Sequence, residues 1–199
     1  MKLWDKGFNV DKAIEDFTIG NDAELDMHLA PFDVLGNIAH VTMLTEVGLL
    51  EKEELPALKK ELGEIYKSTQ DGSFEILPGT EDVHSQVEAL LTERLGDIGK
   101  KVHSARSRND QVSLDIRMKI RDDVNILLQC LIETVSTLVK TAQENTKTIM
   151  PLYTHLQQAQ VGVFSHYLLS YADSLLRDFD RFMSLYTRVN QNPLGAGPV

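Results

Sequence analysis

The sequence of 199 residues contains a single cysteine, Cys130. One cysteine excludes a disulfide framework within the chain and a zinc site built from several thiolates. Basic residues are also scarce, because 20 Lys and Arg stand against 30 Asp and Glu and give a formal net charge of −10. This charge argues against nucleic acid as the main partner. We find no apolar run that approaches the roughly 18 residues of a membrane span. The amino-terminal segment also lacks the apolar stretch of a signal peptide. We therefore expect a cytoplasmic protein with no membrane partner.

Proline is missing from most of the second half of the chain. None of the six prolines lies between residues 79 and 150 or between 152 and 192. Proline removes a helical donor and clashes with the preceding turn, so such stretches permit long helices. We predict one long helix from about Asn109 to Asn145 and a second from about Gln160 to Val189, joined by a loop over 146–159. No strand pattern of useful length appears, so the predicted fold class is all-α.

Shorter helices are predicted upstream of residue 100. One runs from about Phe32 to Glu46, and another follows Leu50 with Pro56 in its first turn, where proline is tolerated. A third has Thr80 as its N-cap and Gly96 just after its end. In the second long helix, sixteen of the 29 residues in 161–189 are apolar. A single buried stripe needs only about three in seven. Further helices, from parts of the polypeptide missing here or from other subunits, must cover the excess, so we predict an oligomer.

The charge of the chain reverses locally. Residues 94–121 hold eight basic and three acidic residues, a net +5 within a chain of −10. At the centre, the loop 103–111 precedes the first long helix, so two arginines, Arg106 and Arg108, meet a helix N-terminus. Free N–H groups and the helix dipole favour an anion there, and arginine binds carboxylates through two hydrogen bonds. A capping loop explains the same residues equally well, because Ser107 and Asp110 have the spacing of a capping box.

Two histidines are candidates for chemistry. His155 lies in the loop between the long helices and is the natural proton-transfer residue, since an unperturbed histidine has a pKa near 6.5; the alternative is a surface histidine in a capping turn. His84 lies one helical turn from Glu88. No third metal ligand is evident beside this pair, so we expect a structural histidine and no metal. Cys130 lies in an apolar stretch, and we expect it in the core.

Three segments together resemble argininosuccinate lyase, a family of the fumarase/aspartase superfamily. They are His-Ser-Ala-Arg-Ser-Arg-Asn-Asp-Gln-Val at 103–112, Met-Pro-Leu-Tyr-Thr-His-Leu-Gln-Gln-Ala-Gln at 150–160 and Asn-Pro-Leu-Gly-Ala-Gly at 192–197. Weaker similarities occur at 2–4, 81–85 and 99–103. The matches follow the family order, and the first two segments together are highly specific.

The resemblance implies the cleavage of argininosuccinate to arginine and fumarate by β-elimination, a step of arginine biosynthesis, without metal or organic cofactor. It implies a homotetramer whose active sites each draw on three subunits. The implied architecture is a small helical domain over 1–107, followed by the start of a long-helix bundle over 108–199. By the same resemblance, Ser107, Arg108 and Asn109 bind the substrate carboxylates. The other implied site residues are Thr154 for substrate binding, His155 as the acid or base, His84 in an orienting role, and Gln157 as a weaker substrate contact.

The sequence also departs from the family. Asp5, Lys6 and Gly7 replace a Gly-Gly-Arg, Asp22 aligns with a substrate-binding serine, and Gln158 and Val161 replace an arginine and a proline. These changes suggest an N-acylated argininosuccinate as an alternative substrate. A third family signature, a Gly-Ser-Ser-x-Met-Pro loop, is missing and family chains are more than twice as long, so we expect no lyase activity from this chain alone.

Two competing functions stay open. The first is another lyase of the superfamily, acting on adenylosuccinate, fumarate or aspartate, which the Tyr-Thr-His-Leu-Gln form of 153–157 disfavours. The second is a structural protein without activity, as the lens delta-crystallins are, which the presence of Asn109, Thr154 and His155 disfavours.

Overall fold

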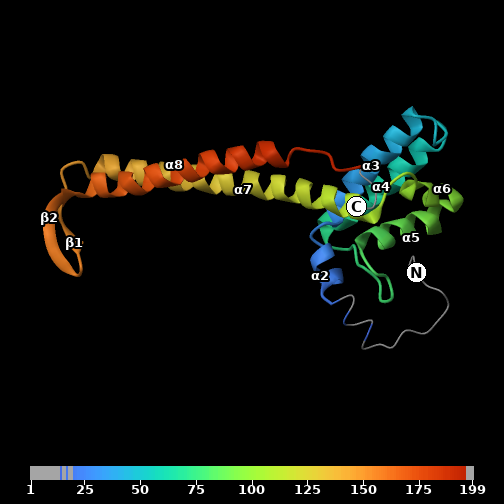
Figure 1. Cartoon of the computed structure of the whole chain (residues 1–199), viewed down its shortest axis with the longest axis horizontal. Coiled ribbons are helices and arrows are strands. Elements are labelled where there is room, and N and C mark those ends of the chain that lie inside the picture. The colour runs from blue at the N-terminus through green and yellow to red at the C-terminus, as the bar shows by residue number, and fades with distance from the viewer. Residues whose placement is uncertain (1–13, 15–16, 18–19, 196–199) are drawn as a thin grey trace. The chain divides into compact units, whose positions relative to one another are not determined.

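The computed structural model describes residues 14, 17 and 20–195, and within these it is built almost entirely of helices (Figure 1). This confirms the predicted all-α class, with one small two-stranded sheet as the exception. The described chain forms two compact units. The first takes in the residues up to Lys119 together with the segment from Asn192, and the second is Ile120–Gln191. The division that the sequence suggests, after residue 107, stays a prediction.

The first unit consists of short helices and the beginning of a long one. Its elements are α2 (Asp22–Asp26), α3 (Ala30–Glu46), α4 (Leu55–Asp71), α5 (Val83–Leu95), α6 (Asp97–Lys100) and the 3-10 turn η1 (Lys101–His103). The predicted helices correspond to α3, α4 and α5. Proline lies in the first turn of both α3 and α4, where no intrahelical donor is lost.

The core of the first unit lies between α3, α4 and α5. Each helix contributes a stripe of buried aliphatic side chains at helical spacing, and loop residues close the ends. The members are Ala30, Val34, Val41, Leu44, Leu50, Leu58, Leu62, Ile65, Phe74, Val83, Val87, Leu91 and Val102. The turn that follows α5 packs back on it at Gly99. A Cβ there would come within 2.4 Å of the backbone of Leu91, so only glycine allows the approach.

The N-cap of α5 differs from the prediction. Asp82, not Thr80, takes the extended backbone conformation, and its side chain accepts a hydrogen bond of 2.7 Å from the backbone N–H of Ser85. The backbone N–H of Thr80 is instead used in a turn to Leu77. An ionised carboxylate is a stronger acceptor than a hydroxyl at the positive end of a helix, which favours Asp82. Gly96 follows the helix as predicted, with a φ of 64°.

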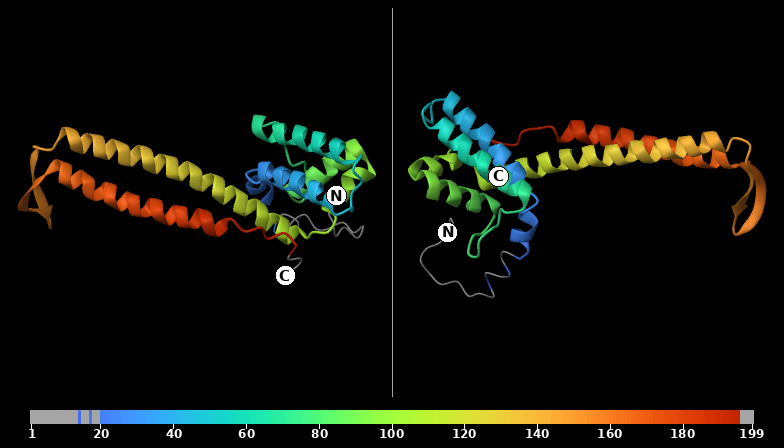
Figure 2. Two further views of the ribbon diagram at one scale, coloured as in Figure 1. Left: turned by 90° about the horizontal axis from the view of Figure 1, so that it is seen from above. Right: turned by 180° about the vertical axis from the view of Figure 1, so that it is seen from behind.

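The second unit contains a helical pair joined by a hairpin. The helix α7 (Arg108–Glu144) begins in the first unit and continues through the second, close to the predicted bounds. After it come β1 (Ile149–Thr154), β2 (Gln157–Val163) and α8 (Phe164–Val189). Within this unit α7 and α8 run side by side, with the hairpin at the end where they connect (Figures 1 and 2).

The predicted loop over 146–159 and the predicted helix start at Gln160 are both wrong. The segment forms an antiparallel hairpin in which Ile149 faces Val163 and Thr154 faces Gln157, with an irregularity at Leu152/Tyr153. The helix begins only at Phe164. Backbone groups that pair across two strands are satisfied without a helix, and Pro151 is tolerated because both strands are edges.

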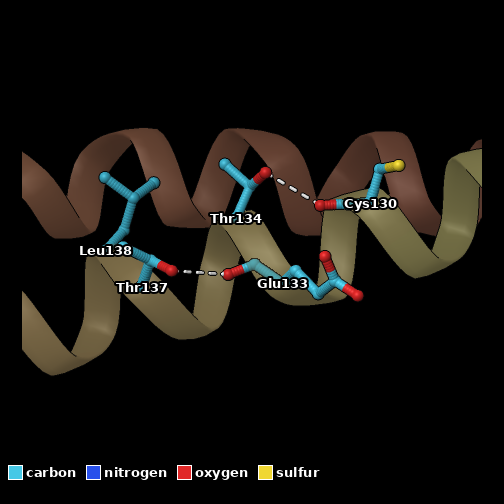
Figure 3. Close-up of a pocket in the computed structure, with 5 residues that line it drawn as sticks. All are labelled: Cys130, Glu133, Thr134, Thr137 and Leu138. Atoms are coloured by element: carbon cyan, nitrogen blue, oxygen red, sulfur yellow. Dashed lines mark hydrogen bonds between the residues drawn. The ribbon is translucent and has the colours of Figure 1, made fainter.

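The pair α7–α8 leaves many apolar side chains exposed. In the second unit the exposed large residues on the two helices are Ile126, Leu127, Ile132, Tyr167, Leu169, Tyr171, Leu176 and Met183. Cys130 is also exposed, so its predicted place in the core is wrong. It borders a depression of about 430 Å³ along α7, where the hydroxyls of Thr134 and Thr137 donate to the backbone carbonyls of Cys130 and Glu133 (Figure 3). Within the apolar stretch around Cys130, Ile126, Leu127 and Ile132 are therefore exposed, whereas Leu128 is buried.

By length and composition alone, α7 could cross a membrane. One window of 18 residues has a mean hydropathy of 1.2, and 11% of it is buried. This corrects the expectation that no stretch of the chain approaches a membrane span. The criterion is weak evidence, because the core helix of a soluble protein passes the same test.

Candidate active site

The beginning of α7 is capped by its own loop. The backbone N–H of Ser107 donates to Asp110 Oδ1 at 2.9 Å, and the Ser107 hydroxyl accepts from the backbone N–H of Asn109 at 3.4 Å. The bond from Asp110 is the one that the predicted capping box requires, whereas the Ser107 hydroxyl caps the second N–H of the helix instead of the third. The second oxygen of Asp110 accepts from the backbone N–H of Gly195 at 3.1 Å, which ties the segment after α8 to the start of α7.

Arg108, the first residue of α7, faces the beginning of α5. Its Nε lies 3.3 Å from Asp82 Oδ2, and one of its terminal nitrogens donates to the Ser85 hydroxyl at 3.3 Å. Asp82 therefore both caps α5 and pairs with Arg108. The side chains of Arg108 and Asp82 are about one-fifth exposed, so an anion can still reach the guanidinium edge. Asn109, the next residue, is exposed.

The side chain of Arg106 points into the protein. The sequence alone identified Arg106 only as a second basic residue of the loop. Ala105 before it has a φ of 61°, a left-handed conformation that redirects the chain. The Arg106 guanidinium donates to Asn37 Oδ1 on α3, and burial lowers the pKa of Arg106. It also borders a cavity of about 380 Å³ whose other wall includes Asn192, Leu194 and Gly195. The structure thus brings the described part of the 192–197 motif beside the 103–112 motif.

His84 lies in the interior and is only 2% exposed. Its Nδ1 lies 2.8 Å from Asp33 Oδ1 and 3.6 Å from Asp115 Oδ2. Burial alone would raise the pKa of Asp33, but the hydrogen bond and charge of His84, with Gln111 and Arg106, outweigh it and lower the pKa. Asp33 is therefore ionised at neutral pH. The expectation of a structurally satisfied histidine holds for Nδ1 only, because His84 Nε2 is buried without a hydrogen-bond partner among the described residues.

Asp115 is a second carboxyl group in the same interior. It is fully buried on α7, and burial, followed by the negative charge of Asp33, raises its pKa to about 9. Asp115 is therefore a neutral acid at neutral pH. Gly36 on α3 lies beside this residue: a Cβ there would be in ordinary contact with Asp115 at 3.6 Å and in tight contact with the Leu114 side chain at 3.3 Å.

Asp33, His84 and Asp115 also have the composition of a metal site. Their potential ligand atoms all lie within 4.8 Å of one another. Asp33 Oδ1, however, is already used by His84 at 2.8 Å and by Gln111 at 2.5 Å. The buried guanidinium of Arg106 supplies positive charge to the same cluster, which disfavours a second cation. The geometry fits a hydrogen-bonded cluster around His84 better than a metal centre.

The second group of predicted residues lies at the tip of the hairpin. Thr154 and Gln157 pair across it, and His155 and Leu156 form the two-residue turn with φ values of 49° and 62°. Two-residue hairpin turns with positive φ at both positions normally hold Asn-Gly or similar pairs, which explains why the sequence did not predict the turn. Such strain in residues other than glycine is concentrated at functional sites. All four residues are exposed, so the His155 imidazole is available to a ligand.

The predicted site residues thus form two groups. Ser107, Arg108, Asn109 and His84 belong to the first unit, whereas Thr154, His155 and Gln157 belong to the second. The partners of His84 and Arg108, namely Asp33, Asp115 and Asp82, were not predicted from the sequence. Asp33 and His84 are 51 residues apart along the chain, and no local pattern joins them. The departures at residues 5–7 and the final two residues of 192–197 lie outside the described residues.

Comparison with known proteins places the chain among lyases. The family model described as Lyase matches residues 6–199. The argininosuccinate lyase of Bacteroides fragilis is 47% identical over 195 residues, which cover 98% of this chain and 44% of that relative. The argininosuccinate lyase of Nitrosopumilus maritimus is 51% identical over 175 residues, which cover 87% of this chain and 35% of that relative. The chain therefore spans less than half of the length of these curated relatives.

Solved structures agree with the fold. An EDDS lyase in complex with formate matches with a TM-score of 0.76 and 30% identity, covering 96% of this chain and 38% of the other. A fumarate lyase:delta crystallin from Brucella melitensis bound to cobalt reaches the same TM-score at 16% identity, covering 94% and 45%, and supports the fold alone. With the family model matching nearly all of the sequence, the chain belongs to the lyase family.

Proposed function

We propose that this chain supplies part of the active site of an argininosuccinate lyase, which cleaves its substrate to arginine and fumarate in arginine biosynthesis. The observation that carries the proposal is the joint presence of the Ser107–Asn109 cap of α7 and the Thr154–Gln157 hairpin tip. Both occur in a chain 47% identical to a protein named argininosuccinate lyase. Neither segment alone identifies the reaction, but together they offer an anion site and a proton-transfer group.

The reaction is a β-elimination. A base removes a proton from the carbon next to a carboxylate, the electron pair forms the carbon–carbon double bond of fumarate, and the guanidinium nitrogen leaves with a proton. Negative charge grows on the carboxylate as the proton departs, so donors aimed at it lower the barrier. Arg108, the Ser107 hydroxyl and Asn109 at the positive end of α7 are suited to this task.

The proton transfers are assigned to His155, with Thr154 and Gln157 as substrate contacts beside it. An exposed imidazole in a strained turn can approach a substrate closely enough to exchange a proton with it. We assign His84 an orienting role. No organic cofactor or metal enters this scheme.

We propose that the complete enzyme is a homotetramer, because the exposed apolar residues of α7 and α8 need to be covered by other subunits. We also propose that it is cytoplasmic. The chain spans 44% of a relative's length, and we propose that alone it forms no fumarate. The second candidate substrate is an N-acylated argininosuccinate, because Asp22, the first residue of α2, stands where the family has a substrate-binding serine.

The test uses the complete polypeptide that contains this sequence. Fumarate formation is followed by ultraviolet absorbance with plain and N-acylated argininosuccinate. We expect His155→Ala to lower turnover by roughly 10²- to 10⁴-fold without loss of helicity by circular dichroism. His166→Ala, an exposed histidine on α8, is the matched control and should retain activity. Unchanged turnover in His155→Ala contradicts the assignment, and turnover of neither substrate contradicts the proposed function.

A further inference from the structure

The buried carboxylate of Asp33 accepts hydrogen bonds from side chains of three different segments. Its Oδ1 accepts from Gln111 Nε2 at 2.5 Å and lies 2.8 Å from His84 Nδ1, and its Oδ2 accepts from Asn37 Nδ2 at 2.9 Å. An ionised carboxylate can only accept. A ring nitrogen of histidine at hydrogen-bond distance from it must therefore carry a proton.

The orientation of Asn37 is fixed from its other side. The Arg106 guanidinium donates to Asn37 Oδ1, and a guanidinium can only donate. The Asn37 side chain therefore directs its oxygen to Arg106 and its Nδ2 to Asp33. Gln111 is not fixed in this way, because its Oε1 is buried without a partner. The side-chain amide of Asn37 therefore cannot rotate to exchange its oxygen and nitrogen, whereas that of Gln111 can.

We propose that Asp33 is a positioning residue, which fixes the tautomer that His84 adopts in its neutral form: the proton stays on Nδ1, and Nε2 is left as an acceptor for the substrate. The part of this inference that concerns the substrate rests on the proposed function. His84 Nε2 is buried and has no hydrogen-bond partner among the described residues, so none of them satisfies it. A bare ring nitrogen cannot donate to a carboxylate, so the complementary group is a hydrogen-bond donor. The guanidinium N–H groups of argininosuccinate are such donors.

Asp115 does not compete with Asp33 for the imidazole. Its nearest carboxyl oxygen lies 3.6 Å from His84 Nδ1, beyond hydrogen-bond distance. Its raised pKa of about 9, caused first by burial and then by the charge of Asp33, keeps it neutral at physiological pH. Asp115 therefore provides a matched control, because the same Asp-to-Asn change in the same cluster leaves the Asp33 carboxylate in place.

The Asp33→Asn substitution is expected to change which ring nitrogen of His84 carries the proton. Because Asn37 keeps Nδ2 toward position 33, the new amide must direct its oxygen to Asn37 and its NH₂ to His84 and Gln111. Gln111 can turn its unpartnered Oε1 to accept from this NH₂. His84 Nδ1 must then accept, so the proton moves to Nε2 and the tautomer is reversed. A comparable Asp-to-Asn change in the serine-protease triad places the histidine in the wrong tautomer.

The tautomer is measured on this chain by the ¹⁵N chemical shifts of the His84 ring, at a pH where the imidazole is neutral. We expect protonated Nδ1 and bare Nε2 in the unmodified chain and in Asp115→Asn, and the reverse in Asp33→Asn. Bare Nδ1 in the unmodified chain overturns the proposal. So does retention of the Nδ1 proton in Asp33→Asn, because Asp33 would then not decide the tautomer.

Kinetics of the complete polypeptide test the consequence for catalysis. We expect Asp33→Asn to lower kcat by roughly 10²-fold or more, with a smaller change in KM. The ring measurement does not depend on turnover. If the tautomers behave as expected and the unmodified polypeptide forms no fumarate, the proposed function fails and the role of Asp33 in setting the tautomer stands. If the tautomer reverses and kcat is unchanged, Nε2 is not used in the reaction.

Discussion

Single residues set the electrostatics of the first unit. Asp33 and Asp115 are the same amino acid, both fully buried around one histidine, yet the pKa of Asp33 is lowered and that of Asp115 is raised. The difference arises because hydrogen bonds from His84, Gln111 and Asn37 reach Asp33, whereas neither oxygen of Asp115 has a hydrogen-bond partner among the described residues. Because carboxyl oxygens of Asp33 and Asp115 lie within 4.8 Å of each other, ionising both groups would cost a large repulsion energy, so one stays protonated.

The raised pKa of Asp115 makes stability depend on pH. Because the folded pKa of about 9 lies above the ordinary value of 3.8, folding favours the protonated form. The contribution of Asp115 to the free energy of unfolding is greatest below about pH 4. It falls as the pH rises to about 9, by at most about 1.4 kcal/mol per pH unit. The asparagine in Asp115→Asn resembles the neutral acid and does not titrate. The free energy of unfolding of this variant, relative to that of the unmodified chain, should therefore increase between about pH 4 and about pH 9.

Urea unfolding between about pH 5 and about pH 9 measures this difference. Asp122→Asn, which removes an exposed carboxylate from the same helix, is the control for the loss of one charge. A stability difference for Asp115→Asn that does not change with pH would show that Asp115 ionises in the folded chain much as it does in the unfolded one.

At the scale of elements, the start of one helix positions the start of another. Asp82 caps α5 through Ser85 and binds Arg108 at the beginning of α7. The hydrogen-bonding function needs only an oxygen, whereas the pairing with Arg108 needs the charge. The two functions can therefore be separated by substitution.

We expect Asp82→Ala to lower the free energy of unfolding by about 1 kcal/mol, because the cap of α5 is lost. Asp82→Asn keeps an oxygen for the Ser85 N–H and should remain within a few tenths of a kcal/mol of the unmodified chain, since the Arg108 pair is partly exposed. Chemical denaturation of both variants tests this. Equal losses in the two variants would mean that the charge of Asp82, not the cap, stabilises the unit.

The hairpin at 149–163 is the element that periodicity did not predict. The segment has no Asn-Gly or Asp-Gly turn signal, and its turn consists of His155 and Leu156. A residue such as leucine is disfavoured at positive φ by about 1–2 kcal/mol. Pairing of the flanking strands must outweigh this cost, and pairing between strands is a tertiary property that local propensity does not contain.

At the scale of the whole molecule, the second unit has more apolar surface than it can cover. The exposed residues on α8, among them Leu169, Tyr171 and Leu176, continue the apolar composition that the sequence shows over 161–189. Several large apolar side chains exposed on one helix are typical of an interface.

We expect the chain to self-associate in sedimentation velocity experiments, and Leu169→Glu to weaken the association, because the introduced charge would be desolvated in the interface. Ser170→Glu adds the same charge at an already polar exposed position of α8 and is the control. A chain that stays monomeric at high concentration would indicate that this face is covered by other segments of a longer polypeptide instead of by second copies.

The sequence by itself determined the helical class, the approximate bounds of α3, α4, α5 and α7, and the capping box at Ser107, because helical periodicity, proline placement and caps are local properties. It also determined the family, through residues of the 103–112 and 150–160 segments. Only the tertiary structure decided that Asp33 and Asp115 surround His84, that Asp82 caps α5 while holding Arg108, and that 149–163 pairs as strands. Each of these depends on contacts between residues far apart in the chain, and burial, which sets the charge of Asp115, exists only once those contacts have formed.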